Sequence, residues 1–403
     1  MVMRFSSRVG STRLNVIAEA ERAARAEGVR LETVNDSNPT HHGLAPKEVP
    51  GVYTAEPRGP LVAREALAEF LTKRNAEESS QVQEQAQADS VDPQRLYLLS
   101  STSQAYSWIF KLMCDPGDIV LGPKPGYPLI ESIGGLECVE TLEYQLEFDG
   151  SWFIDVGWIE RLLDGPQRER VRAIVLINPN NPTGSYVKPE EREALVALCR
   201  EHGIAIIADE VFFDYSLEPF AGNRRLAGEQ GALTFALDGF SKALAAPHAK
   251  VGWIQVSGPD DMVDEAQRRL DVIADDYLPF SDIIATRMPE LLAAVPGQLR
   301  RVQERTRANL KLLHTMLDED EAGLVSVLRP EGGWNVLLRF PSMIDENDLV
   351  LRLIHDSRLT GQPGYFFDMA GNGYLAVSLL PEPDVFRRNI NAVLKAVSAL
   401  MAA

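Results

Sequence analysis

The chain has 403 residues, of which 45% are hydrophobic and 24% are charged, and both fractions are ordinary for a globular protein. These values argue against a mainly disordered, fibrous or membrane-embedded chain. The 40 basic and 58 acidic residues give a net charge of −18, which disfavours binding to nucleic acid or to an anionic membrane, because phosphate contacts need a basic surface.

The three cysteines, Cys114, Cys138 and Cys199, form no Cys-x-x-Cys pair and lie in apolar or helical surroundings. This usage is typical of reduced thiols in a cytoplasmic protein. No stretch of the sequence approaches the roughly 18 consecutive apolar residues of a membrane span. We therefore expect a cytoplasmic protein that does not enter a membrane.

The first ninety residues mix helical patterns with polar segments. Apolar spacing predicts a helix over 11–28, a segment rich in Pro, Gly and Asn predicts a loop over 30–50, and a second helix is expected over 61–73. The polar, acidic insert over 75–90 fits either a solvent-facing extension of that helix or a mobile loop.

From about residue 94, short apolar runs alternate with segments of helical spacing. The runs cover 96–100, 118–122, 173–177, 204–209, 233–238 and 251–256, and the helical segments cover 103–114, 155–164 and 189–202. Continuous apolar strands separated by helices predict a mostly parallel sheet that is covered on both faces. Ligands of such sheets bind beyond the carboxyl ends of the strands.

The C-terminal part is strongly helical over 260–320 and then returns to short strands. Strands are expected within 325–330, 334–340 and 374–380, and a last helix within 384–401. A separate α+β domain, joined by the N-terminal segment, accounts for this pattern. We predict an N-terminal arm with part of the small domain over 1–47, a large domain over 48–295 and a small domain over 296–403.

Four polar signals follow the predicted strands. They are Ser101-Thr102-Ser103, the segment 178–184 (Asn-Pro-Asn-Asn-Pro-Thr-Gly), Asp209, and Ser241-Lys242. This set suits an anionic heteroaromatic cofactor. A helix N-terminus binds an anion, a partly desolvated lysine can form a Schiff base, and a buried carboxylate can keep a ring nitrogen protonated.

Most of these signals also have simpler interpretations. A lysine is usually solvated, an acid after a strand is usually a helix cap, and a Ser-Thr-Ser run is an ordinary N-cap. The 178–184 segment is more specific, because its two prolines fix the backbone and leave the asparagine amides to point inward.

In the order and spacing of these motifs, the chain from about residue 30 onward resembles the class I and II pyridoxal-phosphate aminotransferases of fold type I. The resemblance implies an α/β fold with a large domain, built on a mostly parallel seven-stranded sheet between helices, plus a smaller α+β domain. It also implies pyridoxal 5'-phosphate as cofactor and a homodimer whose two subunits share each active site.

The resemblance assigns roles to individual residues. Lys242 corresponds to the Schiff-base lysine and Asp209 to the partner of the pyridine nitrogen. The other cofactor contacts are implied for Ser101, Thr102, Ser103 and Ser241 at the phosphate, Tyr127 on the ring, Asn181 at the phenolic oxygen, Lys250 at the phosphate, and Tyr53, which reaches the neighbouring subunit's phosphate.

Three positions depart from the family pattern. Lys250 stands where an arginine usually clamps the phosphate, and a lysine offers a point charge instead of a bidentate fork. Phe212 replaces a tyrosine that usually donates to the phenolic oxygen. Tyr215 compensates only if the backbone turns its hydroxyl towards that oxygen. Ala376 occupies the position of the arginine that usually binds the substrate α-carboxylate.

Other residues are therefore candidates for the substrate. Arg339, Lys124, and His41 or His42 are possible replacements for the missing guanidinium, and Asn38 and Trp334 are candidate substrate contacts. Each has a structural alternative, such as a solvated strand residue or core packing. The remaining histidines show no metal spacing, so we expect no metal.

These observations predict an enzyme that moves an amino group between an amino acid and a 2-oxo acid by a ping-pong route. The nearest alternative is a β-eliminating lyase of the carbon–sulfur type, or a specialised enzyme of secondary metabolism that uses the same cofactor. A non-catalytic regulator that binds the cofactor is the alternative of another class, and the acidic charge argues against it. The sequence leaves the amino donor and acceptor open.

Overall fold

The computed structural model describes residues 3–8, 22–24, 26–28, 51–81, 90–218 and 222–402. The predicted 30–50 loop, with Asn38, His41 and His42, lies outside the described residues, and so does most of the predicted 11–28 helix. The polar insert continues the helix α2 (Leu61–Gln81) as far as residue 81, which confirms the predicted helix extension for that part.

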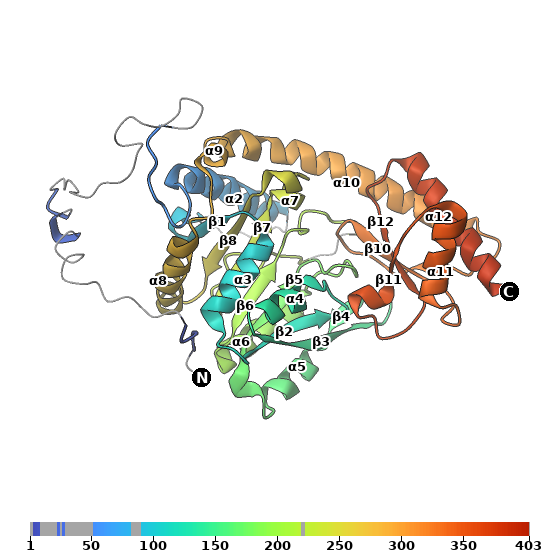
Figure 1. The fold of residues 1–403 in the computed structure, drawn as a ribbon, viewed down its shortest axis with the longest axis horizontal. Helices are drawn as coiled ribbons and strands as arrows, with labels where there is room; N and C mark the ends of the chain where they lie inside the picture. Colours follow the sequence, from blue (N-terminus) through green and yellow to red (C-terminus); the bar gives the residue numbers. More distant parts are fainter. Residues whose placement is uncertain are drawn as a thin grey trace.

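The described part of the chain contains one large sheet with the strand order β1-β8-β7-β6-β5-β2-β3-β4 (Figure 1). Its strands are β1 (Leu96–Leu99), β2 (Ile119–Lys124), β3 (Glu140–Phe148), β4 (Trp152–Ile154), β5 (Val171–Ile177), β6 (Ala205–Asp209), β7 (Thr234–Gly239) and β8 (Gly252–Ser257). Strands β3, β2, β5, β6 and β7 run parallel, whereas β8 is antiparallel to both β7 and β1. All six predicted apolar runs are strands of this sheet.

The sheet has eight described strands, one more than the resemblance implies, because β4 adds a short antiparallel edge to β3. Neither β3 nor β4 is among the strands predicted from the sequence. Most residues of β3 are partly or fully exposed, and its sequence, ETLEYQLEF, alternates polar and apolar side chains. Such alternation is typical of a strand with one solvated face, and the search for continuous apolar runs overlooked it.

Helices cover both faces of this sheet and pack on separate apolar clusters. The α-helices that follow α2 along the chain, as far as the small sheet, are α3 (Thr102–Met113), α4 (Leu129–Leu136), α5 (Val156–Leu163), α6 (Pro189–His202), α7 (Phe240–Ala243), α8 (Asp260–Tyr277), α9 (Asp282–Ala285) and α10 (Met288–Asp318). Helices α3 and α8 bury their apolar sides on one face, and α5 and α6 on the other. This arrangement confirms the layered α/β prediction.

A second, antiparallel sheet has the order β11-β12-β10-β9 and carries the C-terminal helices. Its elements are β9 (Ser326–Val327), β10 (Asn335–Arg339), α11 (Glu346–Arg352), β11 (Gln362–Pro363), the 3₁₀ turn η5 (Gly364–Phe367), β12 (Tyr374–Ser378) and α12 (Pro383–Met401). Figure 1 shows α10 running from the large sheet towards this small sheet.

Backbone hydrogen bonds join the small sheet to the large one just before β10. The Gly332 amide donates to the Gly184 carbonyl and the Gly333 amide to the Tyr215 carbonyl, both at 2.8 Å. An added Cβ on Gly332 would lie 2.7 Å from the Tyr186 ring, so the close approach needs glycine. These contacts bring Trp334 to the end of the large sheet where β6 and β7 finish. Among the described helices, none is long and apolar enough to cross a membrane.

Candidate active site

The carboxyl ends of β6 and β7 bring the main sequence candidates together. Asp209 is the last residue of β6, and Lys242 lies in α7, which starts directly after β7. Gly252 on β8 pairs with Gly239, and an added Cβ there would lie 2.9 Å from the carbonyl carbon of Ser101. The N-terminus of α3 therefore lies against the same turn as the Lys242 segment.

Ser101 is the N-cap of α3, and its hydroxyl accepts from the Gln104 amide at 3.2 Å. Ser101, Thr102, Ser103 and Ser241 are all half-buried. A helix N-terminus with free amides and hydroxyls attracts an anion. The structure thus places the predicted phosphate-binding residues where an anion can reach them.

Asp209 is a buried carboxylate with two hydrogen-bond donors. The Tyr106 hydroxyl donates to Oδ2 at 2.9 Å, and the Val211 amide donates to Oδ1 at 3.3 Å. Burial raises the pKa of Asp209 to about 6, and both donors act in the opposite direction by stabilising the ionised form. A carboxylate held in this way can stabilise a positively charged ring nitrogen.

Lys242 lies among aromatic rings. Its Nζ is 5.0 Å from the ring centres of Phe212 and Trp334, and it makes no hydrogen bond or ion pair within the described ranges. Burial lowers the pKa of the Lys242 amine, while attraction to Asp209 acts the other way. A desolvated amine of this kind is a better nucleophile, because a larger fraction of it is neutral.

Tyr215 does not take over the role of the tyrosine that Phe212 replaces. Its hydroxyl donates to the backbone carbonyl of Lys242 at 2.5 Å, and its ring packs edge-on against Trp334 with centroids 5.0 Å apart. Tyr215 therefore fixes the backbone of the lysine segment.

The three asparagines of the 178–184 loop have different partners. Asn178 accepts from the Val187 amide at 3.0 Å, and Asn180 donates to Thr183 at 2.9 Å. Asn181 is half-buried, and its Oδ1 accepts from Nδ2 of Asn335 on β10 at 3.2 Å. This bond orients the amide so that Nδ2 of Asn181 remains as a donor for a ligand.

The other predicted cofactor contacts are open to solvent. Tyr127 is 42% exposed and Tyr53 is 41% exposed. Lys250 is exposed and adopts the left-handed conformation with φ of 53° just before β8. The structure therefore leaves these three side chains accessible on the chain surface.

The predicted substrate residues divide into two groups. Trp334 is buried beside Phe212, with ring centroids 5.4 Å apart, and its Nε1 has no hydrogen-bond partner within the described ranges. Arg339 is exposed at the opposite end of β10 from Asn335, roughly 13 Å along the strand. The structure brings Trp334 to the lysine and leaves Arg339 away from it.

The position of the absent guanidinium is apolar. Ala376 lies on β12 opposite Leu337, and both pack with the apolar cluster of the large sheet. Lys124, another candidate replacement, donates to Glu143 at 2.6 Å. The positive charge of Lys124 is therefore already paired with the Glu143 carboxylate.

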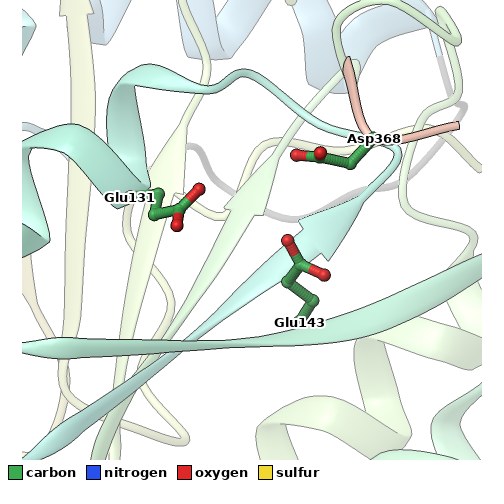
Figure 2. A group of neighbouring side chains, drawn as sticks. All are labelled: Glu131, Glu143 and Asp368. Carbon is green, nitrogen blue, oxygen red and sulfur yellow. The ribbon is translucent and has the colours of Figure 1, made fainter. Parts of the chain in front are cut away.

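Three carboxylates, Glu131, Glu143 and Asp368, form the one group in the described ranges whose ligand atoms are close enough for a metal, within 4.8 Å of one another. Figure 2 shows the three side chains converging from separate segments. Lys124 already supplies a positive charge to Glu143. We assign no metal to this group.

Tyr106 and Asn335 are not among the site residues predicted from the sequence. Tyr106 lies on the buried side of α3, and a buried tyrosine hydroxyl needs a polar partner, which was the available signal. Asn335 starts β10, whose next three residues are apolar, so its amide was a weaker signal of the same kind.

A model of a known protein family matches most of the chain. Residues 53–385 match the family model for aminotransferases of class I and II, whose members use pyridoxal phosphate. The match includes all the predicted cofactor residues.

Two relatives come from Arabidopsis thaliana: the probable aminotransferase TAT1, 26% identical over 76% of this chain, and the S-alkyl-thiohydroximate lyase SUR1, 25% identical over 76%. The matched stretch spans just under two thirds of each relative's own length, 66% and 64%.

The solved structure of an alanine aminotransferase from Pyrococcus furiosus superimposes with a TM-score of 0.74 at 19% identity, covering 98% of this chain and 100% of that one. The superposition confirms fold type I. Together with the family match over most of the sequence, it leads to one conclusion: the chain belongs to the class I and II aminotransferase family.

Proposed function

We propose that this protein is an aminotransferase that moves an amino group from an amino acid to a 2-oxo acid in two half-reactions. The observation that carries the proposal is the pairing of a desolvated Lys242 amine with the buried carboxylate of Asp209 at the ends of adjacent strands. An amine and a carboxylate so arranged suit a cofactor with an aldehyde at one position and a ring nitrogen at another.

The described residues fit pyridoxal 5'-phosphate. The turn around Gly252 leaves no space for a Cβ and sets the Ser101 backbone next to the lysine segment, which forms a cradle for a phosphate. Trp334 Nε1 is a buried donor without a partner in the described part of the chain. When bound, the cofactor supplies an electron-withdrawing ring that accommodates the electron pair left by a broken Cα–H bond.

Each residue then has a defined task. Lys242 Nζ would hold the cofactor through its aldehyde carbon, and the freed amine would take the proton from the substrate Cα. Asp209 would keep a proton on the ring nitrogen. Asn181 Nδ2 would donate to the phenolic oxygen, and Phe212 would add no second donor there, which would leave that oxygen more basic.

The position that usually binds the substrate α-carboxylate lacks its arginine in this chain. Ala376 and Leu337 present an apolar surface where the family usually has an arginine. We infer that another cation binds the substrate carboxylate, or that the substrate carries no carboxylate at that point. Trp334 and Asn335 are the described residues best placed to contact the substrate.

The decisive assay incubates the purified holoenzyme with single amino acids and 2-oxoglutarate. We expect glutamate to form only when the acceptor is present. Pyruvate and ammonia released without an acceptor would instead support elimination, as in a carbon–sulfur lyase. The absence of both products across a panel of amino acids and amines would contradict the proposed activity.

We also propose a homodimer. Three helices at the end of the molecule away from the small sheet, α2, α8 and α9 (Figure 1), each carry an exposed apolar side chain: Val62 at 61%, Tyr277 at 51% and Ile283 at 54%. A second copy of the chain would cover these side chains and bring its own Tyr53 to the site around Lys242. Sedimentation is expected to give twice the 44.6 kDa chain mass, and Val62→Asp combined with Ile283→Asp to give the monomer. A monomeric wild type would contradict the proposal.

Two further proposals concern the arrangement and location of the chain. The domain boundary near residue 295 is supported by Pro296, which interrupts the α10 hydrogen bonding at that point. A cytoplasmic location is supported by the three free thiols Cys114, Cys138 and Cys199, which fit a reducing compartment.

A further inference from the structure

We propose that Tyr106 is a positioning residue that keeps Asp209 ionised and thereby keeps the proton on the cofactor ring nitrogen. The inference rests on the proposed function, because it concerns the same carboxylate. It adds a residue from α3 to a site otherwise built from the ends of β6 and β7.

The geometry of the contact is well defined. Tyr106 is 2% exposed and Asp209 is 7% exposed, and the phenol oxygen lies 2.9 Å from Oδ2. The Tyr106 ring packs edge-on against Phe110, with centroids 6.1 Å apart. Because both partners are buried, neither can exchange this hydrogen bond for one to water.

The phenol is the donor in this bond. Burial, with the nearby Asp209 charge, raises the pKa of Tyr106 well above its ordinary value, so the hydroxyl keeps its proton. The other titratable groups that act on Tyr106 are Tyr144 on β3 and Tyr127 before α4. Asp209 Oδ2 must therefore accept, and only the ionised carboxylate is stabilised as a pure acceptor.

Asp209 needs this stabilisation. Burial and the charge of Asp238 at the end of β7 favour its neutral form, whereas Lys242 in α7 and the amide of Val211 favour the ionised form. The Val211 bond, at 3.3 Å, is longer than the Tyr106 bond. When Lys242 is bonded to the cofactor, its amine no longer serves to stabilise the Asp209 carboxylate. The Tyr106 hydroxyl is then the main donor that opposes the rise in the pKa of Asp209 caused by burial.

The Tyr106 bond therefore influences whether one proton lies on the ring nitrogen or on Asp209. A proton shared between the ring nitrogen and Asp209 stays on the nitrogen when the carboxylate is stabilised, and moves to Asp209 when the donor is removed. Hydrogen bonds to charged groups are strong enough for loss of the Tyr106 hydroxyl to shift this equilibrium by about tenfold or more.

The test uses the holoenzyme loaded with pyridoxal phosphate that carries ¹⁵N in the ring, because the ¹⁵N chemical shift reports whether that nitrogen is protonated. Three proteins are compared across pH: the wild type, Tyr106→Phe and Tyr144→Phe. Tyr144 is a matched control, since it is 1% exposed and its hydroxyl donates at 2.9 Å to a backbone carbonyl, that of Val175.

We expect the ring nitrogen of Tyr106→Phe to lose its proton at lower pH than that of the wild type, with Tyr144→Phe unchanged. Replacing Tyr106 with 3-fluorotyrosine, a stronger donor, is expected to shift the equilibrium the opposite way, which a purely structural role would not do. Equal titration of all variants would overturn the role of Tyr106. Failure of the wild type to bind the labelled cofactor would instead overturn the proposed function.

Discussion

Replacing Lys242 with alanine is expected to lower the rate of amino transfer by about 10⁴-fold, the upper range for losing a positioned acid–base group. The variant lacks both the amine that binds the cofactor aldehyde and the base that takes the Cα proton. Ser101, Asp209 and Asn181 remain in place, so the cofactor should still bind without a covalent bond. The measurement is single-turnover kinetics with a saturating amino acid.

Lys111→Ala provides the control for losing a buried or half-buried lysine. Lys111 lies in the last turn of α3 and pairs with Glu137, whereas the N-terminus of α3 lies against the turn that carries Lys242. Such partly exposed pairs contribute about 0–1 kcal/mol, so activity should stay close to that of the wild type. Comparable activity in Lys242→Ala and the wild type would remove Lys242 from the mechanism.

Asp209→Asn is expected to have opposite effects on activity and on the stability of the cofactor-free fold. The amide cannot balance a positive ring nitrogen, so turnover should fall by about 10²–10³-fold. Glu191→Gln is the control, because Glu191 is a buried carboxylate whose oxygens accept from the Ile154 and Lys188 amides at the start of α6. Its kcat should remain near the wild-type value.

The stability effect follows from the pKa of Asp209, which burial raises from 3.8 to about 6. Between these pH values the folded protein binds more protons than the unfolded chain, so the free energy of unfolding decreases as pH rises through this window. At neutral pH the ionised Asp209 carboxylate lowers the free energy of unfolding by about 3 kcal/mol, and Asp209→Asn removes this loss.

Urea unfolding of the cofactor-free proteins checks this result. The variant should be the more stable protein at about pH 8, and the difference should shrink towards about pH 4. A variant that is equally stable or less stable at about pH 8 would show that burial does not penalise the Asp209 charge. Turnover near that of the wild type would refute its role at the ring nitrogen.

The core of the large sheet was predictable because its strands are buried on both faces and therefore read as continuous apolar runs. The polar residues directly after those runs were predictable for the same reason, since the carboxyl ends of parallel strands meet at one edge. Lys242, Asp209 and Ser101 are separated in sequence and yet follow from this single rule.

What the sequence could not supply depends on contacts between distant segments. Tyr106 and Asn335 look like ordinary members of a helix and a strand until the fold places their polar atoms against Asp209 and Asn181. The role of Tyr215 was equally hidden, because only the backbone path decides whether its hydroxyl faces a ligand or the Lys242 carbonyl.

Borohydride reduction of the purified holoenzyme, followed by proteolysis and mass spectrometry, shows whether Lys242 holds the cofactor covalently. We expect loss of the yellow colour and a single pyridoxyl-modified peptide whose label is on Lys242. A label on another lysine, or no label in a protein that contains the cofactor, would contradict a covalent bond to Lys242.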